Sequence, residues 1–146
     1  MVIDTSGTWW TGESFEDLAE YLRELGVAGH AVDEVRECRC AQCDGLVFGL
    51  RADRVEGGAR RTCRACGLKQ FIADTDEHWA DCTPKTWKCG CGCKDANLAV
   101  GFSLRDDGGD VRWIAVGERC VNCGVLSSFV DWKISYRPSR HLLDQI

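Results

Sequence analysis

Proline, methionine and long apolar stretches are scarce in this chain of 146 residues. It contains two prolines and one methionine, and no apolar run approaches the roughly 20 residues that a membrane-spanning helix requires. The chain begins without a basic stretch followed by an apolar one, so we expect no secretory signal. These absences predict a protein that resides in the cytoplasm and does not associate with a membrane.

Cysteine, in contrast, is abundant, with 11 residues in the chain. Disulfides rarely persist in a reducing cytosol, where cysteine-rich spacings more often bind metal. An odd number of cysteines also disfavours a fully paired disulfide scaffold. We therefore predict metal binding, and disulfide pairing is the alternative.

The first half of the chain has the spacing of a tetrathiolate site. Cys40 and Cys43 are separated from Cys63 and Cys66 by 19 residues, within the range expected for two Cys-x-x-Cys pairs that share one ion. Four thiolates in tetrahedral geometry favour zinc, and iron is the less favoured alternative. The sequence leaves open whether Cys38 replaces Cys40.

The second half contains one clear pair and a choice of partners for it. Cys120 and Cys123 repeat the Cys-x-x-Cys-Gly step, and their partners must come from Cys89, Cys91 and Cys93. Alignment with the first half selects Cys91 and Cys93, although Cys89 could replace either one. The sequence thus predicts a second zinc ion, held by Cys91, Cys93, Cys120 and Cys123.

Three cysteines are left without a ligand role by this assignment: Cys38, Cys82 and Cys89. These cysteines could form a redox pair, a partial third site together with His78, or part of a bridged metal cluster. Because a free buried cysteine commonly behaves as a small apolar residue, we favour a packing role for all three.

Residues 14–25 are predicted to form an amphipathic helix. Ser14 suits the N-cap position, and Gly26 suits the left-handed position that ends a helix. Apolar residues at helical spacing predict one buried stripe, made of Phe15, Leu18, Ala19, Leu22 and Leu25.

Both halves resemble zinc ribbons of the rubredoxin-like type, and the chain as a whole resembles a tandem zinc-ribbon protein over about residues 36–136. The resemblance is carried by the cysteine spacings and by the glycine that follows each Cys-x-x-Cys pair. The run Gly117–Gly124, followed by Asp131–Ile134, also resembles segments of small uncharacterised bacterial proteins.

We therefore predict an α+β, mostly β fold, in which the N-terminal helix packs on two duplicated zinc-ribbon β-hairpin modules. Apolar and polar residues alternate after each cysteine cluster, which is typical of half-buried strands. The expected organisation is an N-terminal segment (1–35), a first ribbon (36–74), an acidic connector (75–87), a second ribbon (88–137) and a C-terminal tail (138–146).

The charge distribution bears on the partner. The net charge is −5, and residues 1–37 carry nine acidic and two basic residues. Because an acidic face can steer a basic partner, we expect a non-enzymatic protein-interaction module, such as an adaptor, an inhibitor or an immunity-type protein. The alternative is nucleic-acid binding through the basic first ribbon, using Arg51, Arg54, Arg60, Arg61, Arg64 and Lys69.

Enzyme activity and rubredoxin-like electron transfer form the last alternative. The three histidines, His30, His78 and His141, lie in no recognisable nucleophile or phosphate-binding motif. An ion with four protein thiolates also keeps no position free for water or substrate. The sequence therefore predicts no catalytic residues.

Overall fold

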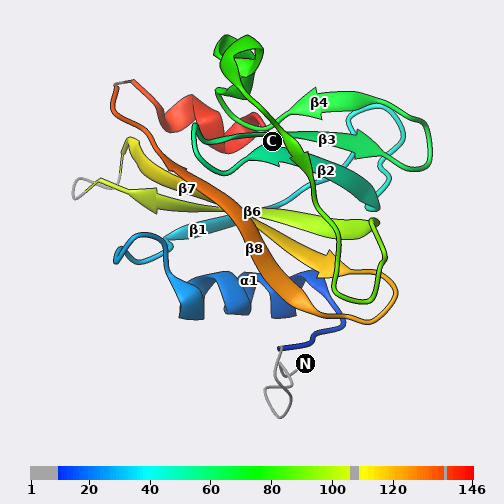
Figure 1. Cartoon of the computed structure of the whole chain (residues 1–146). Helices are drawn as coiled ribbons and strands as arrows, with labels where there is room; N and C mark the ends of the chain where they lie inside the picture. The colour runs from blue at the N-terminus through cyan, green and yellow to red at the C-terminus, as the bar shows by residue number, and fades with distance from the viewer. Residues whose placement is uncertain (1–9, 106–108, 137) are drawn as a thin grey trace.

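A computed structural model describes residues 10–105, 109–136 and 138–146 of the chain. One eight-stranded antiparallel sheet forms its centre, with a single α-helix on one side (Figure 1). The elements are α1 (Phe15–Leu25), β1 (Glu34–Glu37), β2 (Phe48–Asp53), β3 (Gly58–Cys63), β4 (Lys69–Phe71), η1 (Thr75–Glu77), η2 (Trp79–Asp81), β5 (Lys85–Thr86), β6 (Ala96–Leu104), β7 (Val111–Cys120), β8 (Leu126–Lys133) and η3 (Arg140–Asp144).

This content of secondary structure confirms the prediction of an α+β, mostly β fold. The strands of both predicted ribbons join the same sheet, and whether the halves are duplicated units stays a prediction. The first nine residues of the predicted N-terminal segment and residue 137 at the end of the second ribbon lie outside the described residues. Within the described part of the chain, no helix is both long and apolar enough to cross a bilayer.

The predicted helix is confirmed, together with its two ends. The Ser14 hydroxyl oxygen accepts a hydrogen bond from the backbone N–H of Asp17, with an N–O distance of 3.4 Å. At the other end, Gly26 has a φ of 66° and its N–H donates to the carbonyl of Leu22. The side chain of a serine and the freedom of a glycine thus define a helix of three turns.

The helix packs on the sheet through part of its apolar stripe. Leu18, Ala19 and Leu22 are buried, whereas Leu25 is 56% exposed. The prediction that Leu25 belongs to the buried stripe is therefore wrong: this side chain, on the last residue of α1, is left largely in solvent. A Cβ at Gly117 on β7 would lie 2.9 Å from Leu22, so the helix approaches the sheet closely here.

These two leucines provide a matched pair of substitutions. We expect Leu22→Ala to lower the free energy of unfolding by about 2–5 kcal/mol, because it opens a cavity in a fully buried contact. Leu25→Ala should change it by less than about 0.5 kcal/mol. Urea denaturation of the metal-loaded variants tests this, and equal losses for the two leucines would contradict the packing described.

The sheet folds into two layers on the side away from α1. Its strand order is β4-β3-β2-β6-β7-β8, with β1 paired to β6 and β5 paired to β2. Strands β2 and β6 share only the pair Phe48↔Ala96, and beyond it β2, β3 and β4 fold over the face of β6, β7 and β8. Gly57, in the turn between β2 and β3, lies against Trp132 of β8. The main core fills the space between these layers.

Each half of the chain follows the same order of strands and cysteine loops. A loop with several cysteines precedes β2 and β6, and a Cys-x-x-Cys loop follows β3 and β7. Because antiparallel neighbours bring their ends together, this order places two cysteine loops side by side in each half.

Candidate metal centres

Two groups of four cysteines lie close enough to hold one metal ion each. In each group the four sulfur atoms lie within 4.8 Å of one another. The first group is Cys40, Cys43, Cys63 and Cys66, and the second is Cys89, Cys91, Cys120 and Cys123. The structure thus supports two metal-binding sites, and it brings together all four cysteines named for the first.

The first group joins the loop before β2 to the loop after β3. The Sγ atoms of Cys40 and Cys66 are 3.5 Å apart, as are those of Cys43 and Cys63. Gly45 leaves room for the sulfur atoms of this group, because a Cβ at this position would lie 3.1 Å from the sulfur of Cys63. Cys38, the alternative to Cys40, is fully buried in the main core and lies outside the group.

In the second group Cys89 takes the place that the alignment gave to Cys93. The sulfur of Cys89 lies 3.5 Å from that of Cys123, and Cys91 lies 3.7 Å from Cys120. Cys93 turns away, and its sulfur accepts a hydrogen bond from the backbone N–H of Asp95 at 3.4 Å. The grouping of Cys93 with Cys91 is therefore corrected to Cys89 with Cys91.

The backbone conformation of this loop favours the pairing of Cys91 with Cys89 over its pairing with Cys93. The N–H of Gly92 donates to the carbonyl of Cys89, and the N–H of Cys89 donates to the carbonyl of Cys93. This tight turn fits one residue between the paired cysteines, where the other pairs have two. In all four pairs the residue after the second cysteine has a positive φ: Asp44 (62°), Gly67 (80°), Gly92 (95°) and Gly124 (78°).

Donors around the sulfur atoms favour the thiolate form. The backbone N–H groups of Cys66 and Ala65 donate to Cys63 and lower the pKa of its thiol to about 6. In the second group the side-chain amide of Asn122 donates to Cys91, whose pKa is lowered to about 6. Asn122 has no sequence motif of its own and was not among the predicted site residues.

Burial acts in the opposite direction on other members of each group. Desolvation raises the pKa of the Cys89 thiol to about 12. Four thiolates within 4.8 Å of one another also repel one another strongly away from water. All four can therefore ionise together only around a cation, which is the chemistry of a metal site.

The three remaining cysteines lie apart from both groups. Cys38 is buried in the main core, where burial raises the pKa of its thiol to about 12. The thiol of Cys82 donates to the carbonyl of His78, while His78 Nε2 lies 2.7 Å from the carbonyl of Gly57. These contacts tie the segment before β5 to the turn between β2 and β3, and they favour the packing role.

Strand register puts both cysteine groups at the same end of the sheet. Strand register places Cys63, Phe48, Ala96 and Cys120 in one row across β3, β2, β6 and β7. With strands about 4.8 Å apart, the two ends of this row are roughly 14 Å from each other. The centres are thus separate sites on one surface.

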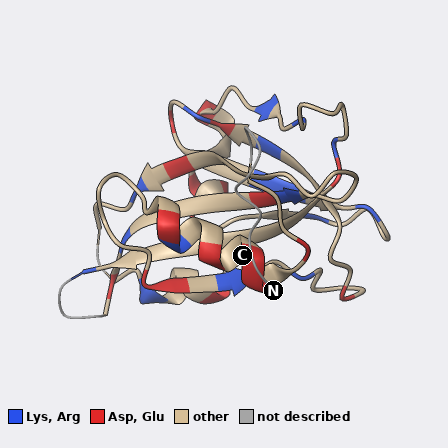
Figure 2. Ribbon diagram, turned by 90° about the horizontal axis from the view of Figure 1, so that it is seen from below, with Lys and Arg blue, Asp and Glu red and all other residues tan. Residues whose placement is uncertain are grey.

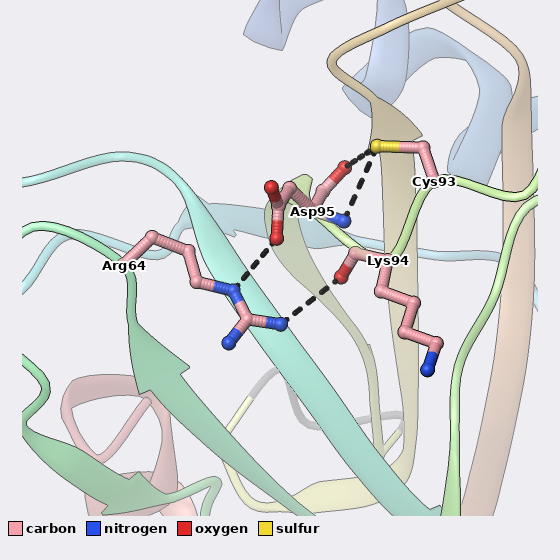
Figure 3. Close-up of polar contacts among 4 residues, drawn as sticks. All are labelled: Arg64, Cys93, Lys94 and Asp95. Atoms are coloured by element: carbon pink, nitrogen blue, oxygen red, sulfur yellow. Dashed lines mark hydrogen bonds and ion pairs between the residues drawn. The ribbon is translucent and has the colours of Figure 1, made fainter.

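An ion pair connects the loops of the two centres (Figure 3). Arg64, which follows Cys63, donates from Nε to the Asp95 carboxylate at 2.7 Å. Its guanidinium also reaches the carbonyl of Lys94 at 3.5 Å and lies over Gly49. Asp95 in turn contacts the sulfur of Cys93, so this cysteine belongs to the connection between the centres.

The ion pair is half-exposed, with 42% of the Arg64 side chain and 46% of the Asp95 side chain accessible. We expect its contribution to stability to stay below about 1 kcal/mol and to decrease in about 1 M salt. A double-mutant cycle with Arg64→Ala and Asp95→Ala, followed by urea denaturation of the metal-loaded proteins, measures this coupling. A coupling above about 2 kcal/mol would contradict the assignment of a weak surface pair.

The six basic residues considered for nucleic-acid binding do not gather on one face with free side chains. Arg61 is fully buried above the Phe48 ring, and Arg64 is held by Asp95. Arg51 donates to the carbonyl of Pro84 and Arg60 lies over Trp79, while Arg54, which lies over Phe129, is exposed. Lys69 is exposed on β4.

No protein-family model matches this chain, and no curated protein or solved structure is detectably similar to it. The resemblance to zinc ribbons therefore rests on the two groups of four cysteines.

Proposed function

We propose that the protein binds two zinc ions in closed tetrathiolate sites and acts as a non-enzymatic module that binds another protein. The observation that carries this proposal is the donor set, four cysteine sulfurs in each group. Because an ion with four protein ligands keeps no position for substrate or water, such sites stabilise a fold and do not perform chemistry.

The spacing of the sulfur atoms supports zinc. Four thiolates at the usual Zn–S distance of about 2.3 Å would lie about 3.8 Å from one another in a tetrahedron. The observed closest separations of 3.5–3.7 Å require only a small adjustment. Iron fits the same cage, and the absorbance of the purified protein distinguishes the two, since zinc thiolate sites are colourless.

Charge near the centres favours a protein over a nucleic acid as the partner. A zinc ion with four thiolates carries a net charge of −2, so two centres carry −4. Each buried ligand has one basic sequence neighbour, namely Arg39, Arg64, Lys88 and Arg119. Arg39 and Arg64, at the first centre, are in turn ion-paired with Glu37 and Asp95, so the surface around this centre keeps little positive potential for phosphates.

The outer face of α1 supports a basic protein as the partner. Glu16, Glu20 and Glu24 of α1 follow one another at spacings of four residues, and all are exposed. Figure 2 views the molecule from the side of this helix. Because residues at these spacings lie on one helical face, the helix presents an acidic stripe away from the sheet.

Affinity capture with a charge-reversed helix tests this proposal. Glu16→Lys, Glu20→Lys and Glu24→Lys are combined in one variant, and Asp76→Lys, Glu77→Lys and Asp81→Lys form a control with the same change in charge. We expect the unmodified chain and the control to retain the same partner at low salt, and the helix variant to lose it. Equal capture by both variants, or capture of nucleic acid alone, would contradict the proposal.

A further inference from the structure

We propose that a cavity between β8 and the second metal centre binds a small organic anion with an aromatic or otherwise apolar body, such as an aryl carboxylate. This inference goes beyond the proposed protein interaction, because it concerns a small molecule and requires no protein partner.

The cavity has the size and the lining of a small-molecule site. Its volume is about 580 Å³, within the range of about 300–1,000 Å³ typical of ligand pockets. Trp87, Val125 and Phe129 supply its apolar lining. Trp87 is fixed in place, since only 4% of it is exposed and its backbone N–H donates to the carbonyl of Leu50 on β2. The apolar part of a ligand would lie among these side chains.

Two cationic side chains line the cavity beside the second centre, whose zinc ion and thiolates carry a net negative charge. Arg54 and Lys88 are the only ionisable residues besides cysteines among the lining residues, and both are exposed. The Arg54 guanidinium lies over the Phe129 ring, 5.2 Å from the ring centre. A cation is thus held next to the apolar lining of the cavity. Neither cation forms an ion pair within 4 Å among the described residues. A guanidinium binds a carboxylate through two parallel hydrogen bonds, which suits this position.

Glu118 lies behind the part of β8 that lines the cavity, and it is not one of the lining residues. Glu118 is fully buried, and its two oxygens accept hydrogen bonds from the Ser127 hydroxyl at 2.9 Å and the Phe129 N–H at 3.3 Å. These bonds hold Ser127 and Phe129, which do line the cavity, at fixed positions on β8. Glu118 thus supports the wall of the site, and its carboxyl group is absent from the lining.

The second metal centre forms another side of the cavity. Cys89, Cys91 and Cys123 contribute to the lining through the loops that hold them. The cavity therefore depends on a filled metal centre, and the ligand must be tested on protein in its metal-loaded form.

Binding of 1-naphthoate, compared with that of 1-naphthalenemethanol, tests the proposal. Both probes carry the same ring system, and only the first is an anion. NMR of the ¹⁵N-labelled, metal-loaded chain is expected to show saturable shifts at the Trp87 indole and at residues 127–129. The naphthoate should bind about tenfold more tightly than the alcohol, as one charge-assisted contact allows.

Two variants distinguish the cavity from general surface binding. Arg54→Gln should weaken naphthoate binding about tenfold and leave binding of the alcohol unchanged. Arg51→Gln, a β2 arginine outside the cavity lining, should leave both within about twofold, and the NMR spectra and metal content of each variant report that it is folded. The proposal is overturned if naphthoate causes no saturable shift at about 1 mM, if the shifts lie elsewhere, or if Arg54→Gln has no effect on naphthoate binding.

Discussion

Removal of the metal with a chelator is expected to unfold the whole chain. A structural zinc site contributes roughly 10–16 kcal/mol of apparent binding free energy, whereas a typical domain has a total stability of only 5–15 kcal/mol. The buried ligand of each cysteine pair, namely Cys40, Cys63, Cys89 or Cys120, also belongs to the main core. Loss of the ions would therefore expose or strain the packing between the two layers of the sheet.

Circular dichroism with an excess of chelator and reductant measures this loss, and elemental analysis confirms that the metal has left. Addition of zinc should restore the spectrum, while magnesium should not, because it prefers oxygen ligands. A cooperative thermal transition that persists in metal-free protein would contradict the structural role of the ions.

Replacement of Cys89 should remove one metal ion, and replacement of Cys93 should remove none. Cys89→Ser takes one of four sulfurs from the second group, so we expect the stoichiometry to fall from two ions per chain to one. The loss of one structural ion should also destabilise the fold by several kcal/mol. Cys93→Ser changes a partly buried thiol outside the groups, and should cost less than about 1 kcal/mol.

The two variants form a matched pair, since each exchanges one sulfur for oxygen in the same loop. Elemental analysis and urea denaturation report the ion count and the stability of each. If Cys93→Ser loses an ion while Cys89→Ser keeps both, the ligand set deduced from the geometry is wrong.

Local features could be predicted from the sequence because neighbouring residues determine them. Ser14 and Gly26 end the helix through contacts within one or two turns. The strand at Phe48–Asp53 was also predicted from its pattern, but both of its faces are covered and only Arg51 is exposed, so it is not half-buried. The position of Leu25 could not be predicted, since its exposure depends on how far the sheet extends beneath the helix.

The joining of the two halves could not be predicted, because it depends on pairing between distant strands, β1 with β6 and Phe48 with Ala96, and on a core that both halves share. The spacing rule identified the first cysteine group, whereas alignment of the halves selected Cys91 and Cys93, with one residue fewer between them than in the first loop. A better signal was present: a residue that tolerates a positive φ follows the second cysteine of every pair. Gly92 follows Cys91, but Lys94 follows Cys93, and this difference favours the pair Cys89 and Cys91.

Native mass spectrometry of the protein, freshly purified in buffer with a reductant, counts the metal ions on the folded chain. We predict two zinc ions per chain, with all 11 cysteines free of disulfides. A folded chain without metal, or one whose clustered cysteines are joined by S–S bonds, would contradict the account.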